Sequence, residues 1–140
     1  FQREVAQRLT AEHNTKSYGR LSVLTQWRNQ CEILFDIPPE AFVPPPKITS
    51  SVVKITPVMP IQDVSQKNLS RLTAAAFNQR RKMLRSSLKP ICSNPQTLLL
   101  QSGIEETRRG ESLSIDEFCT LASNYETIIS AQPTEGEDVK

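Results

Sequence analysis

Apolar residues in the first part of the chain recur at helical spacing. In residues 1–11 they lie three and four positions apart, which predicts an amphipathic helix whose inward side is formed by Val5, Ala6 and Leu9. Residues 18–29 have the same period, with Leu21, Leu24 and either Trp27 or Arg28 on the inward side. We therefore expect the chain to begin with two helices.

Two β-strands are predicted after these helices. In residues 31–37 the polar residues Glu32 and Asp36 alternate with apolar ones, which favours a half-buried strand with Cys31, Ile33, Phe35 and Ile37 inward. Residues 50–56 are rich in β-branched side chains and predict the second strand. An isolated two-stranded hairpin is only marginally stable in water. We therefore expect residues 1–61 to be the last part of a larger α/β domain whose other strands lie upstream.

The next segment predicts one long helix. Residues 63–89 keep a helical period and end before Pro90, with Asp63 as the N-cap and Gln66 completing a capping box. On this helix Leu69, Leu72, Ala76, Met83 and Leu84 gather on one side. This apolar stripe predicts that the helix packs against others.

Two further helices are predicted beyond residue 90. Asn94 followed by a proline is a typical helix start, and Gly103 is the expected stop. Ser114 and Glu117 form a second capping box, and the buried stripe of the last helix is Phe118, Leu121, Tyr125 and Ile128. We expect residues 62–131 to form a small helical domain and residues 132–140 to be a disordered acidic tail.

Charge is distributed unevenly, although the formal net charge is only +2. Residues 64–104 contain no acidic side chain, and their basic residues are Lys67, Arg71, Arg80, Arg81, Lys82, Arg85 and Lys89. On the predicted helix all of these except Arg80 lie on or near the outer face. An ordinary solvated face would interleave acids with bases, because oppositely charged pairs four residues apart stabilise a helix. A face without acids favours a nucleic acid partner, bound through phosphates.

Arg80 departs from this pattern because it falls among the apolar positions of the predicted helix. A buried guanidinium without a partner is costly, so Arg80 should meet a carboxylate. The nearest acids after the basic block are Glu105, Glu106 and Glu111. We expect the partner to be Glu111.

The sequence indicates no metal site. Cys31, Cys92 and Cys119 are widely spaced, without metal-ligand spacing, and we interpret them as reduced cysteines of a cytoplasmic protein. His13 lies in a polar stretch, where a solvated loop histidine is the simpler interpretation. The sequence has no apolar run long enough to span a membrane, and we expect no membrane partner.

Three consecutive prolines, at positions 44–46, follow Phe42 between the two predicted strands. Each proline fixes its φ angle near about −65° and removes a backbone donor. From the residues alone two interpretations stay open. The prolines could present Phe42 rigidly at a site, or Phe42 could be a core residue between strands and helix.

Several segments resemble the rRNA adenine N6-dimethyltransferase family. The stretch FDIPPEAFVPPPKITSSVV, residues 35–53, is similar to the family's FxPxPxVxS element, with Ile48 in place of the valine. YGRLSV (18–23), FNQRRKMLRSSL (77–88) and RGESLSIDEFCTLA (109–122) resemble the bacterial small-subunit enzymes more than the antibiotic-resistance methylases.

This resemblance implies an α/β fold: a Rossmann-like methyltransferase domain, represented here by its C-terminal helices and last two antiparallel strands, followed by a small all-α domain. It implies transfer of methyl groups from S-adenosylmethionine to N6 of two adjacent adenosines in 16S rRNA during ribosome maturation. The implied partner is the 30S ribosomal subunit, and we expect a cytoplasmic monomer. It also implies that Phe42 stacks on the target adenine, since an enzyme that modifies a base takes it out of its stack.

The residues expected to bind rRNA are Lys67, Arg71, Arg81, Lys82, Arg85 and Lys89. The residues expected to bind S-adenosylmethionine are not in this chain. Its glycines are Gly19, Gly103, Gly110 and Gly136, and they do not form a GxGxG turn. The family's Asn-Leu-Pro-Tyr motif is also absent. We therefore expect the cofactor-binding residues upstream of Phe1 and an inactive chain on its own. The alternative function is a non-catalytic rRNA-binding or ribosome-assembly module.

Overall fold

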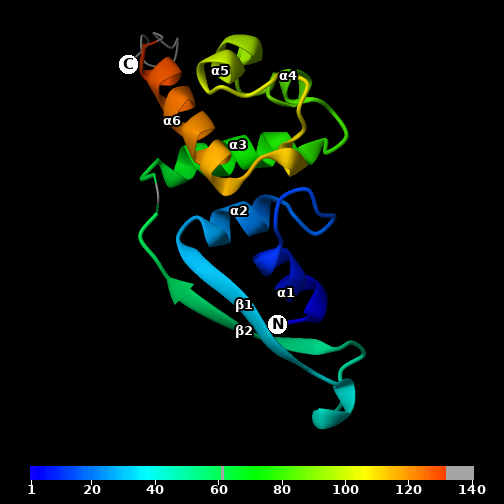
Figure 1. The fold of residues 1–140 in the computed structure, drawn as a ribbon. Coiled ribbons are helices and arrows are strands. Elements are labelled where there is room, and N and C mark those ends of the chain that lie inside the picture. The colour runs from blue at the N-terminus through cyan, green and yellow to red at the C-terminus, as the bar shows by residue number, and fades with distance from the viewer. Residues whose placement is uncertain (61, 132–140) are drawn as a thin grey trace, which may run out of the picture. The chain divides into compact units, whose positions relative to one another are not determined.

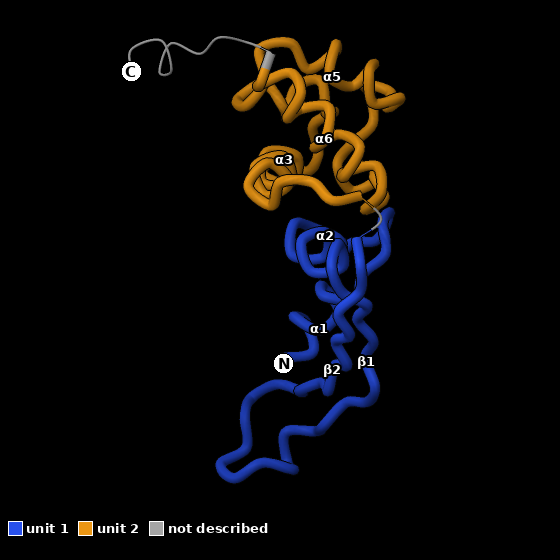
Figure 2. Tube along the Cα trace, turned by 90° about the vertical axis from the view of Figure 1, so that its left-hand side faces the viewer, with its two compact units in different colours: residues 1–61 blue, residues 62–140 orange. Residues whose placement is uncertain are grey.

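The computed structural model describes residues 1–60 and 62–131. The chain divides into two compact units, unit 1 with residues 1–61 and unit 2 from residue 62 onward (Figure 2). The predicted acidic tail, residues 132–140, lies outside the described residues. No helix in the described part of the chain is long and apolar enough to cross a membrane.

Unit 1 is an antiparallel hairpin with two helices packed against it. Helices α1 (Arg3–Thr10) and α2 (Arg20–Gln26) precede strands β1 (Asn29–Ile37) and β2 (Ser50–Pro57) (Figure 1). The predicted order of two helices and two strands is therefore confirmed. Its buried apolar side chains are Ala6, Leu9, Ala11, Tyr18, Val23 and Trp27.

The inward face of α2 differs from the prediction. Leu21 is 41% exposed, whereas Ser22, Val23 and Trp27 are buried. The reason is a polar contact with α1, because the Ser22 hydroxyl donates to the Arg8 carbonyl at 2.5 Å. The Gln26 amide also donates to the Leu9 carbonyl at 2.9 Å. These bonds turn the Ser22 side of α2 toward α1, and Leu21 is left outward.

A β-bulge interrupts the hairpin. Ile33 pairs with Val53 and Phe35 with Val52, so Leu34 is the extra residue on β1. A bulge breaks the two-residue alternation of side chains. The prediction that Phe35 points inward is therefore wrong, and this side chain is 57% exposed.

The first residues of the chain run alongside β2. The Ser51 amide donates to the Phe1 carbonyl at 2.7 Å, and the Arg3 amide donates to the Thr49 carbonyl at 3.0 Å. Gln2 and Ser50 form an antiparallel bridge. Backbone groups at the start of β2 thus form hydrogen bonds with the first residues of the chain as well as with β1.

All regular elements described in unit 2 are helical. They are α3 (Gln66–Asn78), α4 (Leu84–Ser87), α5 (Pro95–Gln101), the 3₁₀ turn η2 (Gly110–Ser112) and α6 (Ile115–Ala131). Fully buried side chains from every α-helix form its core, namely Leu69, Leu72, Leu84, Leu98, Leu99, Phe118 and Leu121.

The predicted single helix over residues 63–89 is wrong. Helix α3 stops at Asn78, and the chain is extended at Met83 before α4 begins. The amide of Leu84 donates to the carbonyl of Arg108 at 2.7 Å instead of to a helical carbonyl four residues earlier. The cap also differs from the prediction, because Ser65 and not Asp63 accepts the bond from the Asn68 amide. Tertiary pairing has overridden a continuous helical pattern.

The caps of the two last helices are confirmed. Asn94 accepts a bond from the Thr97 amide, and Gly103 ends α5 with a φ of 70°. The Ile104 amide donates to Leu99 and the Gly103 amide to Leu100, which completes a Schellman motif. Ser114 and Glu117 exchange the two bonds of a capping box at 3.0 and 3.1 Å.

Candidate nucleic-acid interface

Phe42 lies in the connection between β1 and β2. The 3₁₀ turn η1 (Pro39–Ala41) precedes it, and the Phe42 amide donates to the Pro39 carbonyl at 3.2 Å. The Phe42 side chain is 38% exposed and the neighbouring Val43 is 98% exposed. Among the described residues of unit 1, Phe42 therefore does not fill the core, and both interpretations of this side chain stay open.

An open pocket of about 510 Å³ lies beside the same connection. It is lined by Arg3, Glu4, Gln7, Pro39, Lys47, Ile48 and Thr49, and Phe42 is not among these residues. Arg3 also faces Asp36 at 3.6 Å, and the Ser51 hydroxyl donates to that carboxylate at 2.6 Å. The charge of Arg3 is thus already engaged by the protein.

The predicted rRNA-binding cations all lie in unit 2. Lys67 and Arg71 are one helical turn apart on α3, and both are exposed. Arg81 and Lys82 lie in the turn between α3 and α4, residues 79–83, which we call the basic turn. Lys89 follows α4. All five are exposed, and no ion pair joins any of them to a carboxylate in the described part of the chain.

Arg85 differs from these five because it is half-buried and faces Glu106 at 3.5 Å. The prediction of a largely exposed Arg85 is therefore wrong. Glu106 lies outside residues 63–89, so a helical wheel of that segment could not reveal this contact. The carboxylate of Glu106 thus already engages the Arg85 guanidinium, whereas no described carboxylate pairs with the other five predicted cations.

Arg80 faces Glu111 at 3.7 Å, as predicted. Its guanidinium also lies over the ring of Phe77, 5.3 Å from the ring centre. The side chain is 38% exposed, so the expected burial amid the apolar stripe is wrong. The reason is that α3 has already ended at Asn78, which places Arg80 in the basic turn and not on a helix face.

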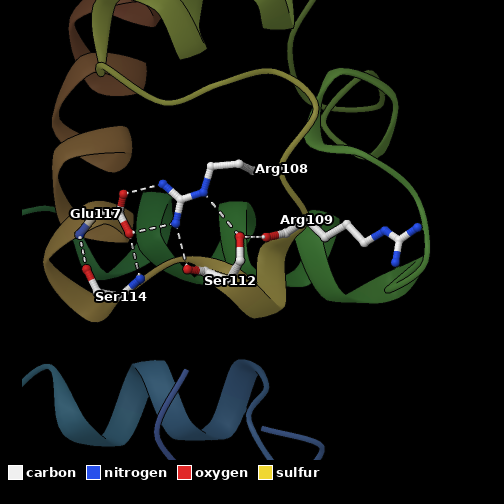
Figure 3. Close-up of polar contacts among 5 residues, drawn as sticks. All are labelled: Arg108, Arg109, Ser112, Ser114 and Glu117. Atoms are coloured by element: carbon white, nitrogen blue, oxygen red, sulfur yellow. Dashed lines mark hydrogen bonds and ion pairs between the residues drawn. The ribbon is translucent and has the colours of Figure 1, made fainter. Parts of the chain in front are cut away.

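Arg108 forms a polar network that the sequence pattern does not predict (Figure 3). Its guanidinium donates to both carboxylate oxygens of Glu117, to the Ser112 carbonyl at 2.6 Å and to the Ser112 hydroxyl at 3.2 Å. The hydrogen bonds from Arg108 hold the pKa of Glu117 below its usual range, and the same pairing raises the pKa of Arg108. The pair is therefore charged at neutral pH and bidentate.

Arg109 is a further exposed cation that the sequence reasoning missed. Figure 3 shows its side chain extended away from Glu117, on the opposite side of the segment from Arg108. The neighbouring Gly110 packs closely on α3, since an added Cβ would lie 3.0 Å from the Cβ of Ala76. The signal that could have revealed Arg109 is the pair of adjacent arginines before a glycine.

The described residues do not fit S-adenosylmethionine. Gly110 is packed against Ala76, and Gly103, which has open space beside it, is an isolated glycine that ends α5, so neither belongs to a glycine-rich turn that a cofactor could approach closely. The described residues also contain no group of three or more His, Cys, Asp or Glu side chains that could hold a metal ion. Exposed arginines and lysines, together with one exposed aromatic ring, are suited to phosphate and base contacts.

Comparison with known proteins identifies relatives of the chain. The profile of the ribosomal RNA adenine dimethylase family matches residues 1–127. The protein named Ribosomal RNA small subunit methyltransferase A from Azorhizobium caulinodans is 51% identical over 125 residues, which cover 89% of this chain and 43% of that protein. The protein of the same name from Bartonella henselae is 56% identical over 123 residues, covering 88% and 44%. The chain thus spans less than half the length of these relatives.

Solved structures share the fold at low sequence identity. A crystal structure of a dimethyladenosine transferase from Plasmodium falciparum matches with a TM-score of 0.72 at 18% identity, covering 91% of this chain and 55% of that one. The 23S rRNA methyltransferase ErmE matches with a TM-score of 0.58 at 16% identity, covering 89% and 52%. Two antiparallel strands with flanking helices are therefore an arrangement found within methyltransferases of known structure.

Proposed function

The chain belongs to the ribosomal RNA adenine dimethylase family, and from this premise we propose that it is the C-terminal part of an rRNA methyltransferase. The proposed reaction is transfer of methyl groups from S-adenosylmethionine to N6 of two adjacent adenosines in small-subunit rRNA. The observation that carries this proposal is the family match over residues 1–127, together with 51% and 56% identity to proteins named small subunit methyltransferase A.

Phe42 is proposed to stack on the target adenine. An adenine taken out of its helix loses stacking, and an aromatic side chain replaces about 1–3 kcal/mol of it per base. The exposure of Phe42 and the bond from its amide to the Pro39 carbonyl support this role, because the ring is accessible and its amide is bonded within the turn.

Unit 2 is proposed to be a separate helical domain that binds rRNA phosphates. The proposed contacts are Lys67, Arg71, Arg81, Lys82, Arg85 and Lys89, to which the structure adds the exposed Arg109 as a candidate. Such contacts fix position and orientation more than sequence. The proposed partner is the 30S ribosomal subunit, met by a monomer in the cytoplasm.

The rest of the catalytic domain is proposed to lie upstream of Phe1 and to supply the cofactor site. Phe1 and Arg3 already pair with backbone groups at positions 49 and 51, which supports an extended strand continuing beside β2. Exposed apolar side chains on the hairpin, among them Leu34, Phe35 and Ile55, are consistent with cover from that domain.

The test uses the full-length protein with undermethylated small ribosomal subunits and labelled S-adenosylmethionine. We expect dimethylated adenosine in nuclease digests of the small-subunit rRNA. Phe42→Ala should reduce turnover at least about tenfold, the equivalent of roughly 1.4 kcal/mol of lost stacking, with unchanged affinity for S-adenosylmethionine. Phe42→Tyr, which keeps the ring, is the matched control and should retain most activity.

A non-catalytic rRNA-binding module is the second candidate, favoured by exposed cations in a chain without a glycine-rich cofactor turn. Binding to small subunits without any methyl transfer by the full-length protein would select it. If Phe42→Ala lowers only the melting temperature, with activity per folded molecule intact, Phe42 is a core residue of the whole protein.

A further inference from the structure

The basic turn is the short connection between α3 and α4. Between α3 and α4 the Lys82 amide donates to the Gln79 carbonyl at 3.0 Å, closing a single turn. Arg81 and Lys82 are exposed on it. The positions of exposed side chains on a short turn depend on the backbone of that turn, which is ordered only when other segments contact it.

The segment at residues 105–112, between α5 and α6, holds the basic turn from one side. The Leu84 amide donates to the Arg108 carbonyl at 2.7 Å, and the Arg85 amide donates to the Glu106 carbonyl at 3.2 Å. Glu111 faces Arg80 at 3.7 Å. These contacts lie at both ends of the basic turn, so its geometry follows that of the 105–112 segment.

The 105–112 segment is in turn anchored through the side chain of Arg108 (Figure 3). Its guanidinium joins Ser112 of the same segment to Glu117 in the first turn of α6. Glu117 is itself fixed by the capping box with Ser114. Thus the backbone of Arg108 contacts the start of α4, while its side chain contacts the start of α6.

From this arrangement we infer that Arg108 is a positioning residue for the rRNA-binding cations of the basic turn. Its bidentate bond to Glu117 fixes the 105–112 segment, and that segment fixes Arg81 and Lys82. Preorganisation of this kind improves affinity because less freedom is lost when the complex forms. The inference rests on the proposed function, since it requires that Arg81 and Lys82 contact rRNA.

Two substitutions loosen the anchor, one without a change in net charge and one that makes the net charge more positive. Arg108→Lys keeps the charge but cannot make the planar fork. Glu117→Gln keeps an acceptor for the Ser114 amide, removes one acceptor for Arg108 and makes the protein more positive. Asn94→Ala is the matched control, because it removes the cap of α5 in the same unit without touching the 105–112 segment. Arg81→Ala is the positive control for a direct phosphate contact.

The experiment measures the affinity of the full-length protein for transcribed small-subunit rRNA at several salt concentrations, well below each variant's melting temperature. We expect Arg108→Lys and Glu117→Gln each to weaken binding about fivefold, from the added cost of ordering the turn. The slope of log affinity against log salt should stay unchanged for both, because the same phosphates are contacted in the complex. Arg81→Ala should lower both affinity and slope, and Asn94→Ala should change neither.

The outcomes separate the possible roles of Arg108. Tighter binding by Glu117→Gln, as added positive charge alone would give, overturns the inference. Unchanged affinity of both Arg108→Lys and Glu117→Gln, while Arg81→Ala weakens binding, also overturns it and leaves the proposed function intact. If Arg81→Ala and Lys82→Ala leave affinity unchanged as well, the proposed rRNA contact fails, and the inference fails with it.

Discussion

Arg80 illustrates how one cation of a basic cluster can serve the fold and not a ligand. Its guanidinium lies between the Phe77 ring and the carboxylate of Glu111, at 5.3 and 3.7 Å. Its neighbours Arg81 and Lys82 are exposed and face no acid in the described residues. Adjacent positions in the sequence thus differ in their contacts, because Arg80 contacts residues of α3 and η2 while no described acid pairs with Arg81 or Lys82.

Arg80→Ala should therefore destabilise unit 2, while Arg81→Ala should not. The lost interactions are a partly exposed ion pair and a cation–π contact, each worth about 0.5–1 kcal/mol, so the expected loss is roughly 1 kcal/mol. Urea unfolding of the full-length variants measures it. Equal stability of the two variants would contradict the assigned role of Arg80.

At the scale of single residues, the sequence allowed the ion-pair partner of one arginine to be predicted but not that of another. The expected ion pair of Arg80 with Glu111 is confirmed, although it was argued from burial on a continuous helix that the structure does not have. Arg108 could not be found in this way. Its bond to Glu117 depends on the path of the chain over residues 109–116, and no helical or strand period describes that path.

At the scale of elements, the end of α3 is set by contacts far along the chain. The pattern over residues 63–89 is compatible with one helix, and its apolar stripe continues through Met83 and Leu84. The structure ends the helix at Asn78, because the amides of Leu84 and Arg85 find acceptors at positions 106 and 108. Helices whose ends carry their own caps, such as α5, were predicted correctly, because the cap residues are local.

The observed cap of α3 gives a prediction at this scale. Ser65→Ala removes the oxygen that accepts the Asn68 amide, and should lower the free energy of unfolding by about 1 kcal/mol. The control is Ser93→Ala, the same substitution at an exposed serine outside any helix. Thermal unfolding should show a lower midpoint for the first variant only. A midpoint unchanged by Ser65→Ala would mean that α3 starts without a side-chain cap in solution.

At the scale of the whole molecule, the family could be recognised from short motifs, whereas contacts between distant segments could not be predicted. The resemblance of residues 35–53 and 77–88 is confirmed by the family match. The bulge at Leu34 and the exposure of Phe35 were missed, although the run of three apolar residues at positions 33–35 interrupts the two-residue alternation at this point. Pairing between distant segments, by contrast, is absent from any local pattern.

The chain of 140 residues is expected not to bind S-adenosylmethionine by itself. Gly103 ends α5 and Gly110 packs against Ala76. The sequence contains no GxGxG turn. Titration calorimetry of this chain should give only the heat of dilution, whereas the full-length protein should give a saturable signal. A saturable signal from the chain alone would contradict the proposed upstream location of the cofactor site.

The bond from Arg108 to Glu117 also imposes an order on events during protein synthesis. Chains are made from the N-terminus, so the basic turn emerges well before the residue that anchors it, and Glu117 follows Arg108 by nine positions. A nascent chain that ends at residue 112 carries Arg81 and Lys82 without their final support. If Arg81 and Lys82 contact rRNA as proposed, they gain their binding geometry only when α6 has begun to form.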